Sequence, residues 1–370
     1  MTTTPGDHNQ PVGEAPITAC RQVPYSLDLR APWVDARGRT TARQGWIVEI
    51  RAGGLRGFGD CAPLVSAGTE APEHAQAALG AVLPRMEGVG PAEALARLPG
   101  PPGPAPAARC AIETALLDLL SQAAGKPLCA FLAGEAAFRE QVEVNGVLGS
   151  VETALARLPE VIAAGYRVAK LKLGTGAWTS ERPALMALVA ALPPGMRLRL
   201  DVNGAWSPEE ATAIIPQLNR WPVESVEEPA GGATRAELVR LQRLASFPLA
   251  LDESLAGRSL ADPPVGRQVL KPMVVGGPAA LVRCADSDIE SVVTTTIDSA
   301  VGAWAAAHAA AAVAGRCGSG QCPAHGLATS DWLAEDLAEG PVPQRGRLML
   351  PGVPGLGVVP DLRCGSRVSG

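Results

Sequence analysis

The sequence contains few aromatic residues and no apolar run long enough to span a membrane. Phe, Trp and Tyr make up 4% of the 370 residues, which argues against a platform that stacks nucleic-acid bases. The most apolar segment, residues 300–314, includes His308 and is shorter than the roughly 20 residues that a membrane-spanning helix needs. A formal net charge of −5 offers no attraction for polyanions. We therefore expect neither nucleic acid nor a membrane as a partner, and nothing indicates an oligomer.

Cysteine is present, but in no pattern typical of a metal site or a disulfide framework. None of the eight cysteines forms a Cys-x-x-Cys motif, and the pair Cys317 and Cys322 has no second pair or clustered histidines beside it. A zinc site is therefore not expected. Residues 1–20 are rich in Thr, Pro and Gly and lack the apolar run of a signal peptide, so we expect a disordered start. Reduced thiols in a cytoplasmic enzyme are the interpretation that follows.

A central stretch of the chain carries charged residues at the ends of short apolar runs. Apolar residues make up 47% of the sequence and charged residues 19%, which is ample for a large core in two domains or one large barrel with a partner. The run ends read Ala-Lys170-Leu-Lys172-Leu, Leu-Arg199-Leu-Asp201-Val-Asn203, Val-Glu227-Glu228-Pro, Leu-Asp252-Glu253-Ser and Leu-Lys271-Pro. They recur at intervals of about 20 to 30 residues, which is the length of one strand-loop-helix unit in a βα barrel. The spacing therefore predicts such a barrel.

These run ends offer three carboxylates and three lysines for chemistry. Polar residues at the carboxyl ends of barrel strands are typically catalytic. Asp201, Glu227 and Asp252 present only hard oxygen ligands, which suit Mg²⁺. Lys170 and Lys172 are two residues apart, so on a strand both point to the same face. Ordinary surface ion pairs would explain any one of these residues, but not six of them at regular strand ends.

The order Lys-x-Lys, Asp-x-Asn, Glu-Glu-Pro, Asp-Glu-Ser and Lys-Pro resembles the enolase superfamily, and in its details the o-succinylbenzoate synthase family, from about Tyr25 to Asp361. The run from Gly57 to Leu64 is similar to a motif that usually has Glu where this chain has Asp60. The resemblance implies an α/β fold, namely a modified (βα)7β TIM barrel with an α+β capping domain. The implied divisions are a disordered segment 1–20, the capping domain 21–138, the barrel 139–335, and a tail 336–370 that returns to the capping domain.

The resemblance also implies a reaction. It is the Mg²⁺-dependent syn dehydration of 2-succinyl-6-hydroxy-2,4-cyclohexadiene-1-carboxylate to 2-succinylbenzoate in menaquinone biosynthesis, through an enediolate, with Mn²⁺ as a substitute metal. Lys172 would remove the proton and later protonate the departing hydroxyl. The like charge of Lys170 would favour the neutral form of Lys172, and Lys271 would stabilise the enolate as a cation. The implied metal ligands are Asp201, Glu227 and Asp252.

Four further residues are predicted to contact the substrate, a small-molecule carboxylate. Thr294, where the family has serine, and Gly326 match positions that line the succinyl pocket in the family. Asn203 shares a strand face with Asp201, although a packed polar layer inside the barrel is an alternative. Arg43 lies in the polar segment 31–45, which in the family reaches over the barrel mouth as a loop. A solvated basic loop would explain this arginine equally well.

Two other interpretations stay open. An N-acylamino-acid racemase or dipeptide epimerase of the same superfamily would use Lys172 and Lys271 on opposite faces of its substrate, so the lysines do not discriminate. Dipeptide epimerases carry Asp-x-Asp near the last strand, which residues 324–329 lack, and the run from Thr294 to Asp298 favours the synthase. A non-enzymatic protein that kept the fold is disfavoured because all six charged residues are present. His325 has no visible partner carboxylate, so we interpret it as structural.

Overall fold

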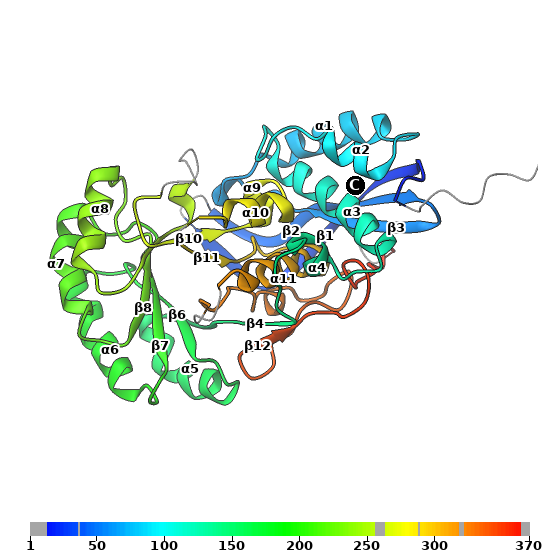
Figure 1. Cartoon of the computed structure of the whole chain (residues 1–370). Coiled ribbons are helices and arrows are strands. Elements are labelled where there is room, and N and C mark those ends of the chain that lie inside the picture. Colours follow the sequence, from blue (N-terminus) through cyan, green and yellow to red (C-terminus); the bar gives the residue numbers. More distant parts are fainter. Residues whose placement is uncertain (1–12, 36–37, 256–262, 288, 318–321, 364–370) are drawn as a thin grey trace, which may run out of the picture.

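The computed structural model describes residues 13–35, 38–255, 263–287, 289–317 and 322–363. Its α/β architecture consists of a parallel sheet that curls into a barrel and a smaller capping region beside it (Figure 1). None of the helices in these ranges combines the length and the hydropathy that a bilayer crossing requires.

The capping region is built on an antiparallel sheet of three strands. They are β1 (Ile17–Asp35), β2 (Gly38–Ala52) and β3 (Leu55–Cys61), in that order across the sheet. Gly53 and Gly54 join β2 to β3 in a hairpin turn with φ values of 55° and 79°, which glycine adopts without strain. The predicted disordered start is too long, because Ile17 is buried and pairs with Ala52 in the ladder between β1 and β2.

Four helices belong to this region, of which α3 packs closely on the sheet while the other three contact α3. They are α1 (Pro72–Val82), α2 (Pro91–Ala96), α3 (Pro106–Ala123) and α4 (Leu128–Ala133). A Cβ added to Gly57 would lie 2.1 Å from the carbonyl oxygen of Ala115 in α3, and one added to Gly59 would lie 1.9 Å from that of Ala111. These two glycines therefore let helix and strand backbones approach each other, and they form no cofactor loop.

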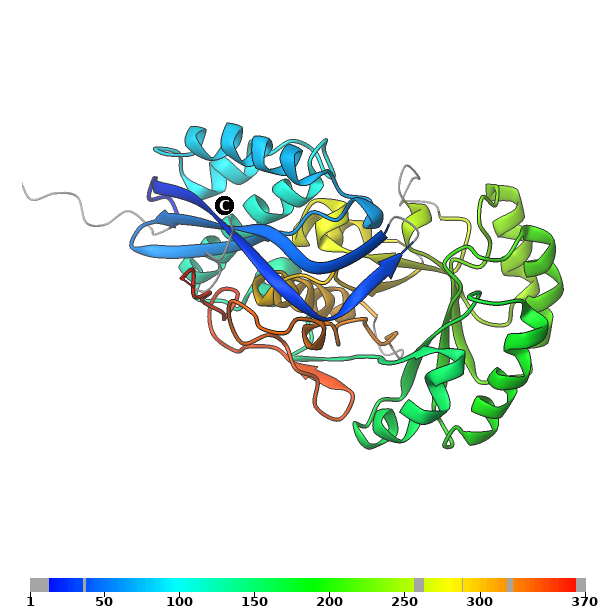
Figure 2. The ribbon, with the colours of Figure 1, turned by 180° about the vertical axis from the view of Figure 1, so that it is seen from behind.

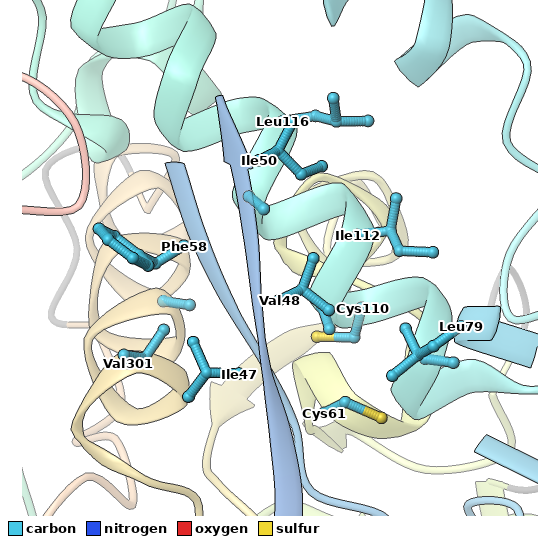
Figure 3. Packing of buried hydrophobic residues seen from close by; sticks show 14 of the residues in the cluster. Ile47, Val48, Ile50, Phe58, Cys61, Leu79, Cys110, Ile112, Leu116 and Val301 are labelled. Carbon is cyan, nitrogen blue, oxygen red and sulfur yellow. The ribbon is translucent and has the colours of Figure 1, made fainter. Parts of the chain in front are cut away.

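The sheet joins two apolar layers into one core. In Figure 3, Val48 of β2 points toward Ile112 of α3, whereas Ile47 points toward Val301 of α11 (Ala300–Gly315). Neighbouring residues of a strand face opposite sides of the sheet, so β2 contributes to both layers. Because α11 is a barrel helix, this core also fastens the capping region to the barrel.

Seven parallel strands form the barrel sheet, in the order β11-β10-β9-β8-β7-β6-β5. They are β5 (Gly146–Ser150), β6 (Val168–Lys172), β7 (Arg197–Asp201), β8 (Val223–Glu227), β9 (Leu249–Leu251), β10 (Arg267–Leu270) and β11 (Glu290–Val293). The helices α5 (Val151–Ala163), α6 (Trp178–Ala191), α7 (Pro208–Leu218), α8 (Arg235–Leu244), α9 (Pro272–Val275), α10 (Pro278–Cys284) and α11 follow individual strands. At the start of α7, Ser207 and Glu210 bond reciprocally to each other's backbone N–H, which forms a capping box.

The ring is closed by residues 324–327, which form bridges instead of a full strand. Gly326 N donates to Val293 O at 2.9 Å on one side, and His325 N donates to Glu143 O at 2.7 Å on the other. Glu143 ends β4 (Gln141–Glu143), which directly precedes β5. The β-branched run 291–297 forms a strand only in its first part, because β11 ends at Val293.

After the barrel, the chain returns to the capping region. The strand β12 (Arg347–Met349) pairs antiparallel with β4. Farther on, Leu128 N donates to Gly355 O, and Leu356 N donates to Asp118 Oδ1, both at 2.8 Å. The segment 31–45, predicted as a loop, belongs to the long ribbon of β1 and β2 wherever it is described. That ribbon runs toward the barrel in Figure 2.

Candidate functional site

Three carboxylates stand at one rim of the barrel. Asp201 ends β7, Glu227 ends β8, and Asp252 directly follows β9. The parallel ladders set Lys172 opposite Asp201, and Asp201 opposite Glu227. This register brings the carboxyl ends of β6, β7 and β8 to the same level, as the barrel prediction required.

Two lysines are paired with these acids. Lys170 Nζ lies 2.8 Å from Asp201 Oδ2 and 2.8 Å from Glu227 Oε1. Lys271, which follows β10, places its Nζ 2.6 Å from Asp252 Oδ1. Both lysines and all three acids are largely shielded from solvent. Five of the six predicted charged groups therefore form one buried cluster.

Burial and neighbouring anions raise the pKa of two of the three acids, whereas Lys170 outweighs burial at Glu227 and lowers its pKa. Burial, together with the charge of Glu227, raises the pKa of Asp201 to about 6 despite the opposing charge of Lys170. Burial likewise raises the pKa of Asp252 to about 7, although Lys271 opposes the shift. Burial lowers the pKa of Lys170, but Glu227 and Asp201 outweigh it and hold that pKa above its usual value. At Asp201 and Asp252 the lysines thus only partly offset burial and the charge of neighbouring carboxylates.

The donor chemistry of this cluster fits Mg²⁺. It offers three carboxylates and no soft ligand, and a divalent cation would relieve the repulsion among Asp201, Glu227 and Asp252. In the part of the chain that the structure describes, no three His, Cys, Asp or Glu side chains are already gathered as a metal-binding group. Two of the acids turn their oxygens toward Lys170 and the third toward Lys271. The ligand roles therefore stay a prediction.

Lys172 differs from the other two lysines. It lies on the strand face of Lys170, it is exposed, and within the described ranges it has no hydrogen-bond or ion-pair partner. Lysine is rare in this chain, with four residues among the 32 Lys and Arg, and three of the four belong to this site. Arginine stays protonated in proteins, whereas lysine can lose its proton. The chain thus uses lysine mainly where a proton could move.

Backbone strain is concentrated at the same rim. Among the described residues, four that are not glycine have a positive φ, and three of them follow the barrel strands β7, β8 and β11. They are Asn203 at 49°, Glu228 at 46° and Ile297 at 63°. The Glu228 carboxylate accepts bonds from Asp252 N at 2.7 Å and Ser254 N at 2.9 Å, which fixes the chain next to the Asp252 side chain. Such strain is typical of ligand-binding edges.

The predicted substrate contacts Thr294 and Gly326 lie side by side. The Thr294 hydroxyl donates to the carbonyl oxygen of Gly326 at 2.8 Å, and a Cβ on Gly326 would lie 2.7 Å from Thr294 Oγ1. Glycine is therefore required beside this threonine. Asn203 is exposed at the rim, and its backbone N–H donates to Asp201 Oδ1 at 3.3 Å. Substrate contact by these three residues stays a prediction.

Arg43 has other partners than a substrate in this structure. Its buried guanidinium donates to the carbonyl oxygens of Ala62 at 2.8 Å, Pro63 at 3.1 Å and Ile297 at 3.0 Å. Arg43 thus connects β2 to the segment that follows β11. The alternative interpretation, a solvated basic loop, is wrong because Arg43 is buried and lies on the strand β2.

Below the rim, Arg199 points into a second polar layer. Its Nη1 donates to Asn145 Oδ1 at 3.0 Å, its Nη2 to Ala324 O at 2.8 Å, and its Nε to Glu224 Oε2 at 3.2 Å. The neighbouring His325 accepts a bond from Val293 N at Nδ1. Burial, with help from nearby arginines, lowers the pKa of His325 to about 3. A neutral imidazole that bonds β11 serves barrel closure, which supports the structural interpretation.

Comparison with known families places the chain in a class. Residues 153–363 match the family described as Enolase C-terminal domain-like, and residues 20–100 match the MenC N-terminal domain family. Because the first match spans more than half of the chain, the protein belongs to the enolase superfamily.

Relatives within this superfamily have different activities. The chain is 32% identical to muconate cycloisomerase 1-2 of Acinetobacter lwoffii over 57% of this chain and 57% of that protein. It is 33% identical to the o-succinylbenzoate synthase of Thermobifida fusca over 55% and 64%, and 31% identical to the hydrophobic dipeptide epimerase of Roseobacter litoralis over 62% and 66%. Each alignment spans less than two thirds of the relative's own length.

A solved structure supports the fold along almost the whole chain. The muconate lactonizing enzyme of Pseudomonas fluorescens superimposes with a TM-score of 0.81, covering 95% of this chain and 98% of that one, at 24% identity. The (βα)7β barrel with its capping region is therefore the fold of this protein.

Proposed function

We propose that this protein is a hydro-lyase, an o-succinylbenzoate synthase that converts 2-succinyl-6-hydroxy-2,4-cyclohexadiene-1-carboxylate to 2-succinylbenzoate and water in menaquinone biosynthesis. The match to the MenC N-terminal domain family and the similarity to the Thermobifida fusca synthase support this branch of the superfamily. The observation that carries the proposal is the state of Lys172, an amine without a partner in the described part of the chain, next to paired acids.

In this proposal Lys172 moves the proton. Its neutral amine takes the proton α to the substrate carboxylate and later gives it to the departing hydroxyl on the same face, so that water leaves and the amine is regenerated. Lys170, held between Asp201 and Glu227, keeps a positive charge on the same strand face as Lys172. Lys271 keeps its charge through Asp252 and stabilises the negative charge that develops.

A magnesium ion is part of the proposal. Asp201, Glu227 and Asp252 would hold it, and as a Lewis acid it would supply charge stabilisation to the substrate carboxylate. Thr294 and Gly326 would line the pocket for the succinyl chain.

The test is an ultraviolet assay of the purified protein with the cyclohexadiene substrate and Mg²⁺. Lys172→Ala should lower turnover by at least about 100-fold, the usual contribution of a general base. Lys126→Ala is the matched control, because Lys126 is the one lysine outside the site and is exposed. Turnover by Lys172→Ala equal to that of the control would reject the assigned base.

An isomerase is the second candidate. The similarity to a dipeptide epimerase favours it, and an N-acylamino-acid racemase or epimerase would also need one lysine on each side of its substrate. Incubation with N-succinyl amino acids and with dipeptides in deuterated water separates the candidates. Deuterium incorporation without any dehydration of the cyclohexadiene would replace the synthase by the isomerase.

A further inference from the structure

The segment Thr294–Ser299, here called the β11 loop, holds a strained conformation. Ile297 is β-branched and buried, yet its φ is 63°, a region that such residues rarely enter. Within the loop, Thr296 donates from its N–H and its hydroxyl to Asp298 Oδ1, at 3.1 and 2.5 Å, and Ile297 N donates to Thr295 Oγ1 at 3.3 Å. A conformation of this kind persists only where surrounding contacts enforce it.

Two strands of the capping sheet supply such contacts, and the third strand supports one of them. Arg43 of β2 donates from Nε to Ile297 O at 3.0 Å. Asp60 of β3 accepts at Oδ2 from Ser299 N at 2.9 Å and from the Ser299 hydroxyl at 2.8 Å. Tyr25 of β1 donates its hydroxyl to Asp60 Oδ1 at 2.7 Å, which orients that carboxylate. Each of these side chains is buried, so water does not compete for the bonds.

The other end of the β11 loop reaches the candidate site. Thr294 begins the loop and contacts Gly326. Asp298 lies close enough to Lys271 and Arg43 for their charges to lower its pKa against the larger effect of burial. The loop therefore connects the residues bonded by the capping sheet to the contact between Thr294 and Gly326.

The fit around Asp60 leaves no spare room. A Cβ on Gly302, in the first turn of α11, would lie 2.8 Å from Asp60 Oδ2 and 2.7 Å from Asp298 Cβ. The absence of that side chain lets both acids sit against the helix. The Asp60 carboxylate, which accepts three hydrogen bonds, thus fits against α11 because position 302 of the helix has no side chain.

We infer that Asp60, oriented by Tyr25 and assisted by Arg43, is a positioning residue that holds the β11 loop in its strained form and thereby sets the pocket wall at Thr294. The inference deepens the proposed function and rests on it for the identity of the substrate. Arg43 then acts on the substrate through the loop instead of touching it. The capping sheet thus contributes to substrate specificity without touching the substrate, because it positions the β11 loop that carries Thr294.

The first experiment compares Asp60→Asn with Asp118→Asn. Asparagine keeps the size of Asp60 but turns an N–H₂ group toward donors, so at least one of its bonds to Ser299 or Tyr25 is lost. We expect KM to rise by about tenfold, the effect of one net hydrogen bond, with kcat little changed because Lys172 is untouched. Amide hydrogen exchange in residues 294–299 should accelerate. Asp118→Asn removes an equally buried carboxylate of the same region that bonds Phe58 N and Leu356 N, and it should leave KM and loop exchange unchanged.

The second experiment uses Gly302→Ala, which removes no polar group and adds a single methyl group against Asp60 and Asp298. In a helix, Gly→Ala ordinarily stabilises, but here the methyl group would displace Asp60 and Asp298. We expect a lower Tm, faster exchange of the β11 loop and a higher KM. A stabilised Gly302→Ala variant with unchanged KM, or a folded Asp60→Asn variant whose loop exchanges like the wild type, would overturn the inference.

The two proposals fail in different ways. If the wild type converts neither the cyclohexadiene nor any N-succinyl amino acid or dipeptide, the proposed function falls. The exchange measurements still decide the positioning role, since they require no substrate.

Discussion

Glu224→Gln tests the polar layer that closes the barrel below the candidate site. Glu224 lies between two buried arginines, with Oε2 at 3.2 Å from Arg199 Nε and Oε1 at 2.6 Å from Arg267 Nη1. Arg199 in turn bonds the Asn145 side chain, next to β5, and the carbonyl oxygen of Ala324, in the segment 324–327 that closes the barrel. Replacing the carboxylate by an amide leaves both guanidinium groups without their shared anion.

The size of the effect follows from the proton affinity of Glu224. Burial raises its pKa, but the charges and hydrogen bonds of Arg199 and Arg267 outweigh burial and lower it from 4.5 to about 2. Each tenfold change in proton affinity is worth about 1.4 kcal/mol, so the ionised carboxylate stabilises the fold by about 3 kcal/mol. Because the folded pKa is depressed, this stabilisation is present above pH 4.5 and is lost as pH falls toward 2.

Glu290→Gln is the matched control. Glu290 also pairs with Arg267, at 2.5 Å, but 47% of its side chain is exposed. Exposed pairs of this kind contribute about 1 kcal/mol or less. The free energy of unfolding at pH 7 can be measured by urea unfolding followed by tryptophan fluorescence. We expect it to be about 3 kcal/mol lower for Glu224→Gln than for the wild type, and within about 1 kcal/mol of the wild type for Glu290→Gln. The difference between Glu224→Gln and the wild type should narrow below pH 4.5.

An equal loss of stability in the two variants at pH 7, or a difference that does not change at low pH, would refute this reasoning. The first result would mean that the buried pair of Glu224 with Arg267 stabilises the fold no more than the exposed pair of Glu290 with Arg267. The second would mean that the carboxylate charge is not what stabilises the layer.

Three further outcomes are expected. Asp201→Asn should weaken Mg²⁺ binding in calorimetry, because one anionic oxygen ligand is lost; wild-type affinity would remove Asp201 from the proposed ligands. Gly326→Ala should raise KM, because its Cβ would lie 2.7 Å from Thr294 Oγ1, and an unchanged KM would show that this wall does not contact substrate. At pH 7.5 iodoacetamide should modify Cys317 before Cys20, because a hydrogen bond from Cys322 lowers the pKa of Cys317 to about 7 while burial raises that of Cys20 to about 11. Mass spectrometry after partial labelling would expose the reverse order.

Strand ends and helix caps could be predicted from the sequence because they depend on residues close together in the chain. The βα spacing located the strands that end in Lys172, Asp201 and Glu227, and these strands align at one rim. The capping box at Ser207 depends on residues three apart, and it is present. Longer strands were harder to delimit. The β-branched run 291–297 has strand composition throughout, but Ile297 has a positive φ. Arg43 bonds its carbonyl oxygen and Asp60 bonds the nearby Ser299, contacts that the composition does not contain.

The amino-acid sequence by itself determined which groups stand at the rim of this barrel, because strand length and repeat spacing carry them to the same ends of successive strands. Only the tertiary structure decided how those groups are used. Lys170 and Lys271 are paired while Lys172 is free within the described residues, and Arg43 bonds the backbone behind the pocket. Such pairing joins residues as many as 254 positions apart, and it depends on register and burial, which no local pattern encodes.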